Sequence, residues 1–112
     1  GRVWAIWQPH TYSRTKELME GFAASFDNAD RVIVLPVYPA RETDTLGVSA
    51  ADVVDAMDHR EARVAESMEQ ALGWLLAAVR PGDVVLTLSA GDGNWVGERL
   101  LTELKGRVDA EG

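Results

Sequence analysis

The sequence predicts an α/β fold, a three-layer Rossmann-like domain in which helices cover both faces of a mainly parallel sheet. Two observations lead to this prediction. Short apolar runs rich in valine and isoleucine alternate along the chain with segments whose apolar residues recur every three or four positions. The chain has 112 residues, enough for one domain with a single core and too few for two. Because strands that alternate with helices are joined by right-handed crossovers, the strands are expected to lie parallel.

Four strands are predicted, each brief and mostly apolar, as in strands that are buried on both faces of a sheet. They cover residues 3–7, 31–37, 63–65 and 83–88. The third strand is the shortest. The fourth follows Pro81 and Gly82, which end the preceding helix and turn the chain into the strand.

Four helices are predicted from the three- and four-residue periodicity. They cover residues 14–26, a shorter helix through Val53 to Met57, residues 68–79 and residues 95–105. Ser67 with Gln70 forms the pattern of a capping box, and Ser49 with Asp52 is a similar start for the shorter helix. Beyond residue 105 the chain is polar and is expected to fray.

Charge and composition exclude several classes of function. The formal net charge of −7 and the scattering of eleven basic residues argue against a nucleic-acid surface, since phosphate binding needs clustered lysine and arginine. The longest apolar run, residues 71–79, is about half as long as a membrane-spanning helix. Neither a nucleic acid nor a membrane is therefore expected as a partner, and a cytoplasmic location is expected. The chain has no cysteine, and His10 and His59 are far apart in the sequence, so no metal site is expected.

Ligands of parallel α/β sheets bind beyond the carboxyl ends of the strands. This rule selects the connections at residues 8–13, 38–48 and 89–94. After the first strand, Arg14 stands near a helix N-terminus, where free N–H groups and the helix dipole favour an anion. The alternative is that Thr11 or Ser13 caps the helix, that Arg14 is solvated, and that His10 binds a carbonyl of the turn.

The second connection is longer than the ~2–6 residues that are usual between a strand and a helix in this class of fold. Long loops inside compact domains are often lids or binding loops, and Arg41 and Glu42 are the candidate functional groups of this one. The alternative is a mobile, solvated loop in which Glu42 and Asp44 contribute only to solubility.

The third connection and the start of the helix that follows it carry three glycines, Gly91, Gly93 and Gly97. Their spacing, G-x-G-x-x-x-G, is one residue longer than the dinucleotide-binding fingerprint, so a Rossmann cofactor is not expected. The turn can bring backbone amides close to an anion, with Asp92 placed to accept a hydrogen bond or to cap the following helix. No phosphate loop of the form G-x-x-x-x-G-K-[ST] occurs in the sequence.

Taken together, three segments resemble the C-terminal domain of the Mur ligases, and above all the branch that joins L-alanine to UDP-N-acetylmuramate. They are QPHTYSRT after the first strand, LPVYPARE with GVS after the second, and SAGD after the last. The similarity runs in the same order from Val3 to about Leu104. It implies that residues 1–112 are one domain of a three-domain enzyme.

In the enzymes of this family an N-terminal domain holds the UDP sugar, a central domain binds ATP and Mg²⁺, and the C-terminal domain brings the amino acid. The resemblance therefore implies an ADP-forming amide ligase of peptidoglycan synthesis. Its substrates are UDP-N-acetylmuramate, which is activated as an acyl phosphate, and L-alanine, whose amine attacks it. ATP and Mg²⁺ are expected to be bound mainly by the absent domains and not by this chain, which is expected to be inactive alone.

The resemblance also implies roles for single residues. Arg14 is assigned to the carboxylate of the amino acid or to the developing phosphate, and His10 and Ser13 to supporting hydrogen bonds. Tyr12 is expected to form a wall of the pocket. Arg41 is assigned to substrate binding from the second connection.

The glycine turn is expected to close over the same cleft, with Asp92 binding substrate and Gly91 approaching the cofactor. Two positions depart from the family pattern: Ser89 replaces the first glycine of GAGD, and Thr11 stands where some members have a second arginine. Two alternatives stay open, a stand-alone α/β module that binds a nucleotide or an anion, and a regulatory domain that binds a partner through its acidic surface.

Overall fold

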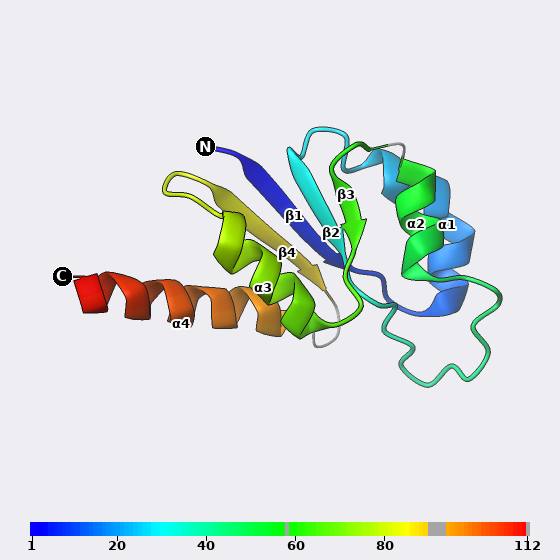
Figure 1. Ribbon diagram of the computed structural model, residues 1–112. Coiled ribbons are helices and arrows are strands. Elements are labelled where there is room, and N and C mark those ends of the chain that lie inside the picture. Colours follow the sequence, from blue (N-terminus) through cyan, green and yellow to red (C-terminus); the bar gives the residue numbers. More distant parts are fainter. Residues whose placement is uncertain (58, 90–93, 112) are drawn as a thin grey trace.

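The computed structural model describes residues 1–57, 59–89 and 94–111, in which strands and helices alternate (Figure 1). In chain order the elements are β1 (Val3–Gln8), α1 (Tyr12–Ala24), β2 (Arg31–Val34), α2 (Ala50–Met57), β3 (Ala62–Val64), α3 (Met68–Ala78), β4 (Val84–Ser89) and α4 (Asn94–Glu111). The strands form one sheet in the order β3-β2-β1-β4, and every pairing is parallel. The predicted α/β class is confirmed.

Helices lie on both sides of the sheet, with α1 and α2 on one side and α3 and α4 on the other (Figure 1). Successive residues of a strand point to opposite faces, and β1 is apolar in both directions. Trp4 and Ile6 pack in a core cluster with Leu75 of α3. Trp7, from the opposite face of β1, packs in a second cluster with Val53 of α2. The prediction of burial on both faces is therefore right for β1.

The same prediction is wrong for β4, which lies at the edge of the sheet. Val84, Leu86 and Leu88 are 49%, 50% and 46% exposed. In register these residues lie beside Val3, Ala5 and Trp7 of β1, and so point to the side of α1 and α2. Those helices do not extend over β4, so one face of this strand stays open to solvent.

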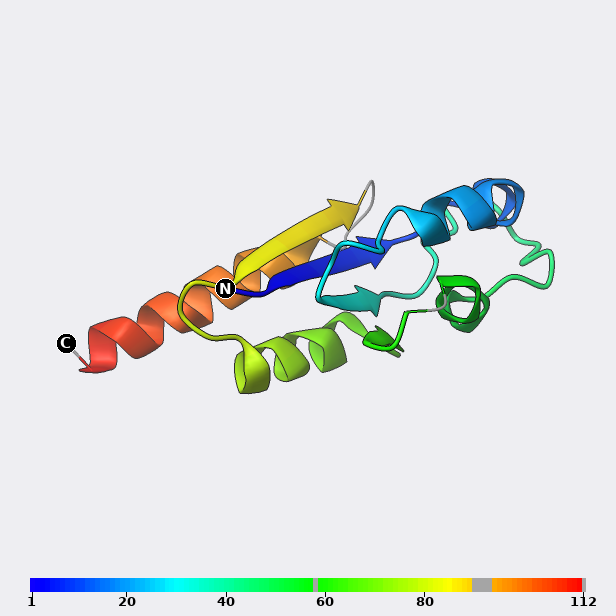
Figure 2. The same cartoon turned by 90° about the horizontal axis from the view of Figure 1, so that it is seen from above.

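Two element boundaries differ from the predicted ones. The predicted strand at residues 31–37 ends as a regular strand at Val34, and Pro36, two residues later, has no N–H to donate to a neighbouring strand. The last helix does not fray after residue 105 but continues to Glu111. An ion pair between Arg99 and Glu103 lies within it at 3.1 Å, and the Arg107 guanidinium donates to the carbonyl of Leu76 in α3 at 3.2 Å. Figure 2 shows α4 projecting past the sheet.

Both predicted capping patterns are confirmed. The Ser67 hydroxyl accepts a hydrogen bond from the N–H of Gln70 at 3.0 Å at the start of α3. At the start of α2, Asp52 accepts from the N–H of Ser49 at 2.9 Å, and the Ser49 hydroxyl accepts from the N–H of Asp52 at 3.4 Å. Such reciprocal bonds satisfy N–H groups that have no partner inside the helix.

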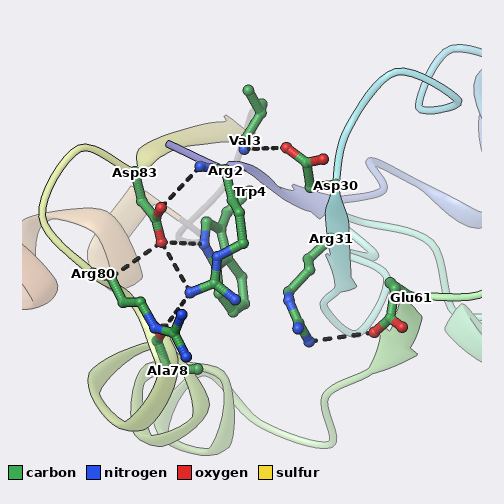
Figure 3. Close-up of polar contacts among 9 residues, drawn as sticks. All are labelled: Arg2, Val3, Trp4, Asp30, Arg31, Glu61, Ala78, Arg80 and Asp83. Carbon is green, nitrogen blue, oxygen red and sulfur yellow. Dashed lines mark hydrogen bonds and ion pairs between the residues drawn. The ribbon is translucent and has the colours of Figure 1, made fainter.

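The amino ends of the strands are held by a network of charged side chains around Asp83 (Figure 3). Its carboxylate accepts hydrogen bonds from the Arg2 N–H at 2.8 Å, the Trp4 indole N–H at 3.0 Å, the Arg80 N–H at 3.0 Å and the Arg2 guanidinium at 3.1 Å. The side chain of Asp83 is only 3% exposed. The hydrogen bond from the backbone of Arg2 is the largest of the causes that hold the pKa of Asp83 well below its usual range.

Two more carboxylates complete this network, which we call the amino-end cluster. Asp30 accepts a hydrogen bond from the N–H of Val3 at 2.6 Å, and Glu61 pairs with the guanidinium of Arg31 at 3.2 Å (Figure 3). The Arg31 guanidinium also lies 5.3 Å from the centre of the Trp4 ring. Each of these acidic groups thus has a partner within the domain, so the cluster serves the fold.

Candidate functional site

The connections after β1 and β2 lie side by side and continue the pairing of the two strands. Leu35 donates its N–H to the carbonyl of Trp7 at 2.8 Å, and Tyr38 donates to the carbonyl of Pro9 at 2.8 Å. The N–H of Thr11 returns to the carbonyl of Tyr38 at 2.7 Å. Residues 9–14 and 38–42 therefore form one hydrogen-bonded unit at the carboxyl end of the sheet, which we call the carboxyl-end site.

His10 lies inside this unit and is half-buried. It forms an isolated parallel bridge with Tyr38, and the two rings are stacked with their centres 5.6 Å apart and their planes at 20°. No hydrogen bond joins the His10 imidazole to another described residue, so the alternative that His10 binds a carbonyl of the turn finds no support among them. Stacking on Tyr38 fixes the ring while leaving its nitrogens available.

Thr11 immediately precedes α1 and has an uncommon backbone conformation, with φ at 60°. Its hydroxyl accepts from the N–H of Arg14 at 3.3 Å, and its carbonyl accepts from the N–H of Thr15 at 3.2 Å and from the Thr15 hydroxyl at 2.6 Å. The alternative in which Thr11 caps this helix therefore describes the structure. A β-branched residue with positive φ is strained, and the surrounding hydrogen bonds hold it there.

Glu42 reaches across from the second connection to the start of α1. Its carboxylate accepts hydrogen bonds from the N–H groups of Tyr12 and Ser13, the latter at 3.2 Å. A hydrogen bond from the Ser13 side chain is the largest of the causes that lower the pKa of Glu42 below its ordinary value. The N-terminus of α1, predicted to be free for an external anion, is thus occupied by a carboxylate of the domain itself. The alternative in which Glu42 is merely solvated is wrong.

Two arginines of the carboxyl-end site have no partner among the residues that the structure describes. Arg14, in the first turn of α1, and Arg41, next to Glu42, are both exposed. Neither guanidinium forms an ion pair or a hydrogen bond with a side chain that the structure describes. Arginine binds carboxylate and phosphate groups through paired N–H donors, so these two side chains are suited to an external anion.

Tyr12 faces a pocket of about 610 Å³ beside this unit. The pocket lies between the connection after β2, the start of α2 and the residues that follow β3, and Val37, Ser49 and Glu66 also line it. A larger hollow of about 900 Å³ runs along β4 and α4 from the turn that precedes β4. We place the site at the carboxyl ends of β1 and β2, because ligands of parallel sheets bind beyond these ends.

Of the third predicted connection, the structure describes only the first and last residues, Ser89 and Asn94. Ser89, the last residue of β4, lies in register with Gln8, the last residue of β1, and its hydroxyl donates to the Gln8 side chain at 2.8 Å. The two strands therefore end side by side. Gly91 and Asp92 lie outside the described residues, so their predicted roles stay predictions.

The sequence profile of the family described as "Mur ligase, glutamate ligase domain" matches residues 1–91. This chain belongs to the Mur ligase family. Over 102 residues it is 44% identical to the UDP-N-acetylmuramate–L-alanine ligase of Lachnospira eligens, an alignment that covers 89% of this chain and 22% of that protein. Over 103 residues it is 48% identical to the protein of the same name from Desulfatibacillum aliphaticivorans, covering 89% and 23%.

A solved structure shows the same fold. The UDP-N-acetylmuramate–alanine ligase MurC of Thermotoga maritima superposes with a TM-score of 0.67 at 22% identity, covering 95% of this Mur ligase chain and 21% of the other. The chain thus spans about a fifth of the length of the relatives that it matches.

Sequence reasoning on this Mur ligase domain missed the contact of Glu42 with α1. The residues that meet are 29 and 30 positions apart, and no local pattern marks them. The usable signal was the topology: β1 and β2 are parallel neighbours, so the connections that follow them start at the same edge of the sheet.

Metal and membrane sites find no support in the described part of the chain. No group of three histidine, aspartate or glutamate side chains there is placed to hold a metal ion. None of the described helices combines the length and the apolar character that crossing a bilayer requires.

Proposed function

We propose that this chain is the amino-acid-delivering domain of a ligase that joins L-alanine to UDP-N-acetylmuramate in peptidoglycan synthesis. One observation carries the proposal: proteins named for that reaction are 44% and 48% identical to the chain over 89% of its length. The chain spans about a fifth of those proteins, so the remaining domains supply the rest of the site. The 112 residues alone should form no product.

Within this reaction we assign the carboxyl-end site to the incoming amino acid. Amide formation requires the amine of L-alanine to lie close to the activated carboxylate, and holding both in one geometry removes much of the entropic barrier. Arg14 is exposed and without a described partner, and it is assigned to the carboxylate of L-alanine or to the developing phosphate. His10, Ser13 and Tyr12 then shape the same side of the cleft, and Arg41 adds positive charge.

ATP and Mg²⁺ belong to the parts of the enzyme that this chain lacks. Phosphates bind well to free N–H groups at helix N-termini, but those of Tyr12, Ser13 and Arg14 are already taken by Glu42 and Thr11. The described residues at this helix start therefore do not fit the phosphates of a nucleotide. We derive no step of ATP chemistry from them.

The test is Arg14→Ala in the full-length ligase. Removing one preorganised donor should lower kcat/KM for L-alanine by the equivalent of ~2–4 kcal/mol of transition-state stabilisation. Steady-state measurements with ATP, UDP-N-acetylmuramate and L-alanine check this. Arg60→Ala is the matched control, because Arg60 is also exposed but lies in the turn before β3, at the other end of the sheet. Equal rates for both variants would remove the carboxyl-end site from the reaction.

The proposal separates cleanly from a stand-alone binding module. A module of that kind should bind a nucleotide or an inorganic anion at micromolar concentration without other domains. Calorimetry of the 112-residue chain with ATP and with inorganic phosphate should show no such binding under the ligase proposal. A regulatory domain, in turn, would leave amide formation unchanged in Arg14→Ala.

A further inference from the structure

We propose that Glu42 is a positioning residue for the amino-acid substrate: it locks the turn at residues 9–14 and keeps substrate anions off the N-terminus of α1. This inference rests on the proposed ligase function and goes beyond it by naming a residue that touches no substrate. Three features of the carboxyl-end site support it: the contacts of Glu42, the backbone that they hold, and the cations left unpaired beside them.

The first feature is that every N–H group in the first turn of α1 already has an acceptor within the domain. A helix start leaves four N–H groups without a partner inside the helix, and these attract anions. Glu42 accepts from the N–H groups of Tyr12 and Ser13, while Thr11 accepts from those of Arg14 and Thr15. The whole first turn of α1 is therefore satisfied by the domain, with no donor left for a substrate carboxylate.

The second feature is the strained backbone on both sides of the contact. Thr11 has φ at 60° and Ala40 has φ at 55°, values that residues other than glycine rarely adopt. One lies in the turn after β1 and the other in the connection after β2. Such conformations persist only where the surroundings hold them. Here two contacts join the segments: the N–H of Thr11 donates to the carbonyl of Tyr38, and the N–H of Tyr12 donates to the carboxylate of Glu42.

The third feature is the contrast between Glu42 and the arginines around it. Glu42 is half-buried against α1, whereas Arg14 and Arg41 are exposed and form no ion pair with a described residue. An incoming carboxylate therefore finds the backbone amides already hydrogen-bonded and binds the guanidinium of Arg14 instead. By fixing the turn that carries Arg14, Glu42 sets where that carboxylate binds.

The experiment compares Glu42→Ala with the wild type in the full-length ligase. Without Glu42, the freed amides compete with Arg14 for the carboxylate of L-alanine, and the turn loosens. KM for L-alanine should rise by about tenfold, the equivalent of one lost hydrogen bond to a charged group, while KM for UDP-N-acetylmuramate stays unchanged. Added formate, a small free carboxylate, should lower the raised KM in Glu42→Ala and should not lower KM in the wild type.

Two further variants make the result decisive. Glu42→Gln keeps an acceptor oxygen for the N–H groups of Tyr12 and Ser13 and should raise KM for L-alanine less than Glu42→Ala does. It also serves if the alanine variant does not fold. Asp44→Asn is the matched charge control, because Asp44 lies in the same connection and, among the described residues, accepts only from the nearby N–H of Leu46 at 2.9 Å.

The opposite sign overturns the inference. If the start of α1 is itself the substrate site and Glu42 only blocks it, Glu42→Ala should lower KM for L-alanine. An unchanged KM in Glu42→Ala and Glu42→Gln, or no response of Glu42→Ala to formate, also rejects it. Failure of the ligase proposal looks different: the wild type would then form no amide, or Arg14→Ala would match the wild type.

Discussion

The two ends of the sheet use charged side chains in opposite ways. At the amino end, Asp83 pairs with Arg2 and Glu61 pairs with Arg31 (Figure 3). At the carboxyl end, Arg14 and Arg41 have no partner among the described residues. Charges that are paired within the domain stabilise it, whereas exposed charges without partners are available to a ligand. The contrast separates the part of the domain that serves the fold from the part that serves the reaction.

The largest expected effect on stability comes from Asp83→Ala. The change leaves the Trp4 indole N–H and the backbone N–H of Arg2 without their acceptor in a place where the side chain of Asp83 is 3% exposed. The unfolding temperature of the domain should fall by several degrees, while kcat/KM per folded molecule stays that of the wild type. Calorimetry and steady-state rates check both. A loss of activity without a loss of stability would break the contrast between the two ends.

The pH dependence of stability follows from the same carboxylate. The folded state lowers the pKa of Asp83, so its stabilising effect is complete above the ordinary value of about 4 and is lost as the pH falls through the folded value. Acid unfolding should therefore depend less on pH in Asp83→Asn than in the wild type. Tryptophan fluorescence during an acid titration measures this, and equal slopes would contradict it.

A moderate effect is expected from Gly97→Ala in α4. A Cβ at this position would lie 2.9 Å from the Cγ2 of Thr87 in β4, which is closer than two carbons can approach. Overpacking of this kind costs ~1–3 kcal/mol of unfolding free energy. Gly73→Ala in α3 is the control, because a Cβ there meets nothing within 4 Å and should stabilise the helix slightly. Denaturant unfolding of both variants should give opposite signs.

The smallest effect is expected from Glu61→Gln, within the amino-end cluster. Its pair with Arg31 is exposed, with 38% of the Arg31 and 53% of the Glu61 side chain open to solvent. Exposed ion pairs contribute ~0–1 kcal/mol to stability, so the unfolding free energy should fall by at most ~1 kcal/mol. The difference from Asp83→Ala in the same experiment would show how much of the cluster's stability depends on burial. An equal loss in the two variants would show that burial is not the deciding factor.

The sequence predicted those features that depend on neighbouring residues. The periodicities located all eight elements of the described part of the chain, and local side-chain chemistry located the caps at Ser49 and Ser67. The open face of β4 was missed, because its apolar composition matches that of a central strand and strand order is not written locally. The contact of Glu42 with Tyr12 was missed for the same kind of reason, since it joins residues that only the parallel pairing of β1 and β2 brings together.

The bare side of β4 has a practical consequence for anyone who handles the domain as a separate polypeptide. Val84, Leu86 and Leu88 form an exposed apolar stripe along β4, which in the described part of the chain pairs with another strand on one side only (Figure 1). Edge strands can pair with strands of other molecules, and an exposed apolar stripe on such a strand promotes aggregation. Leu86→Lys would put a charge in the middle of the stripe and should reduce aggregation of concentrated samples.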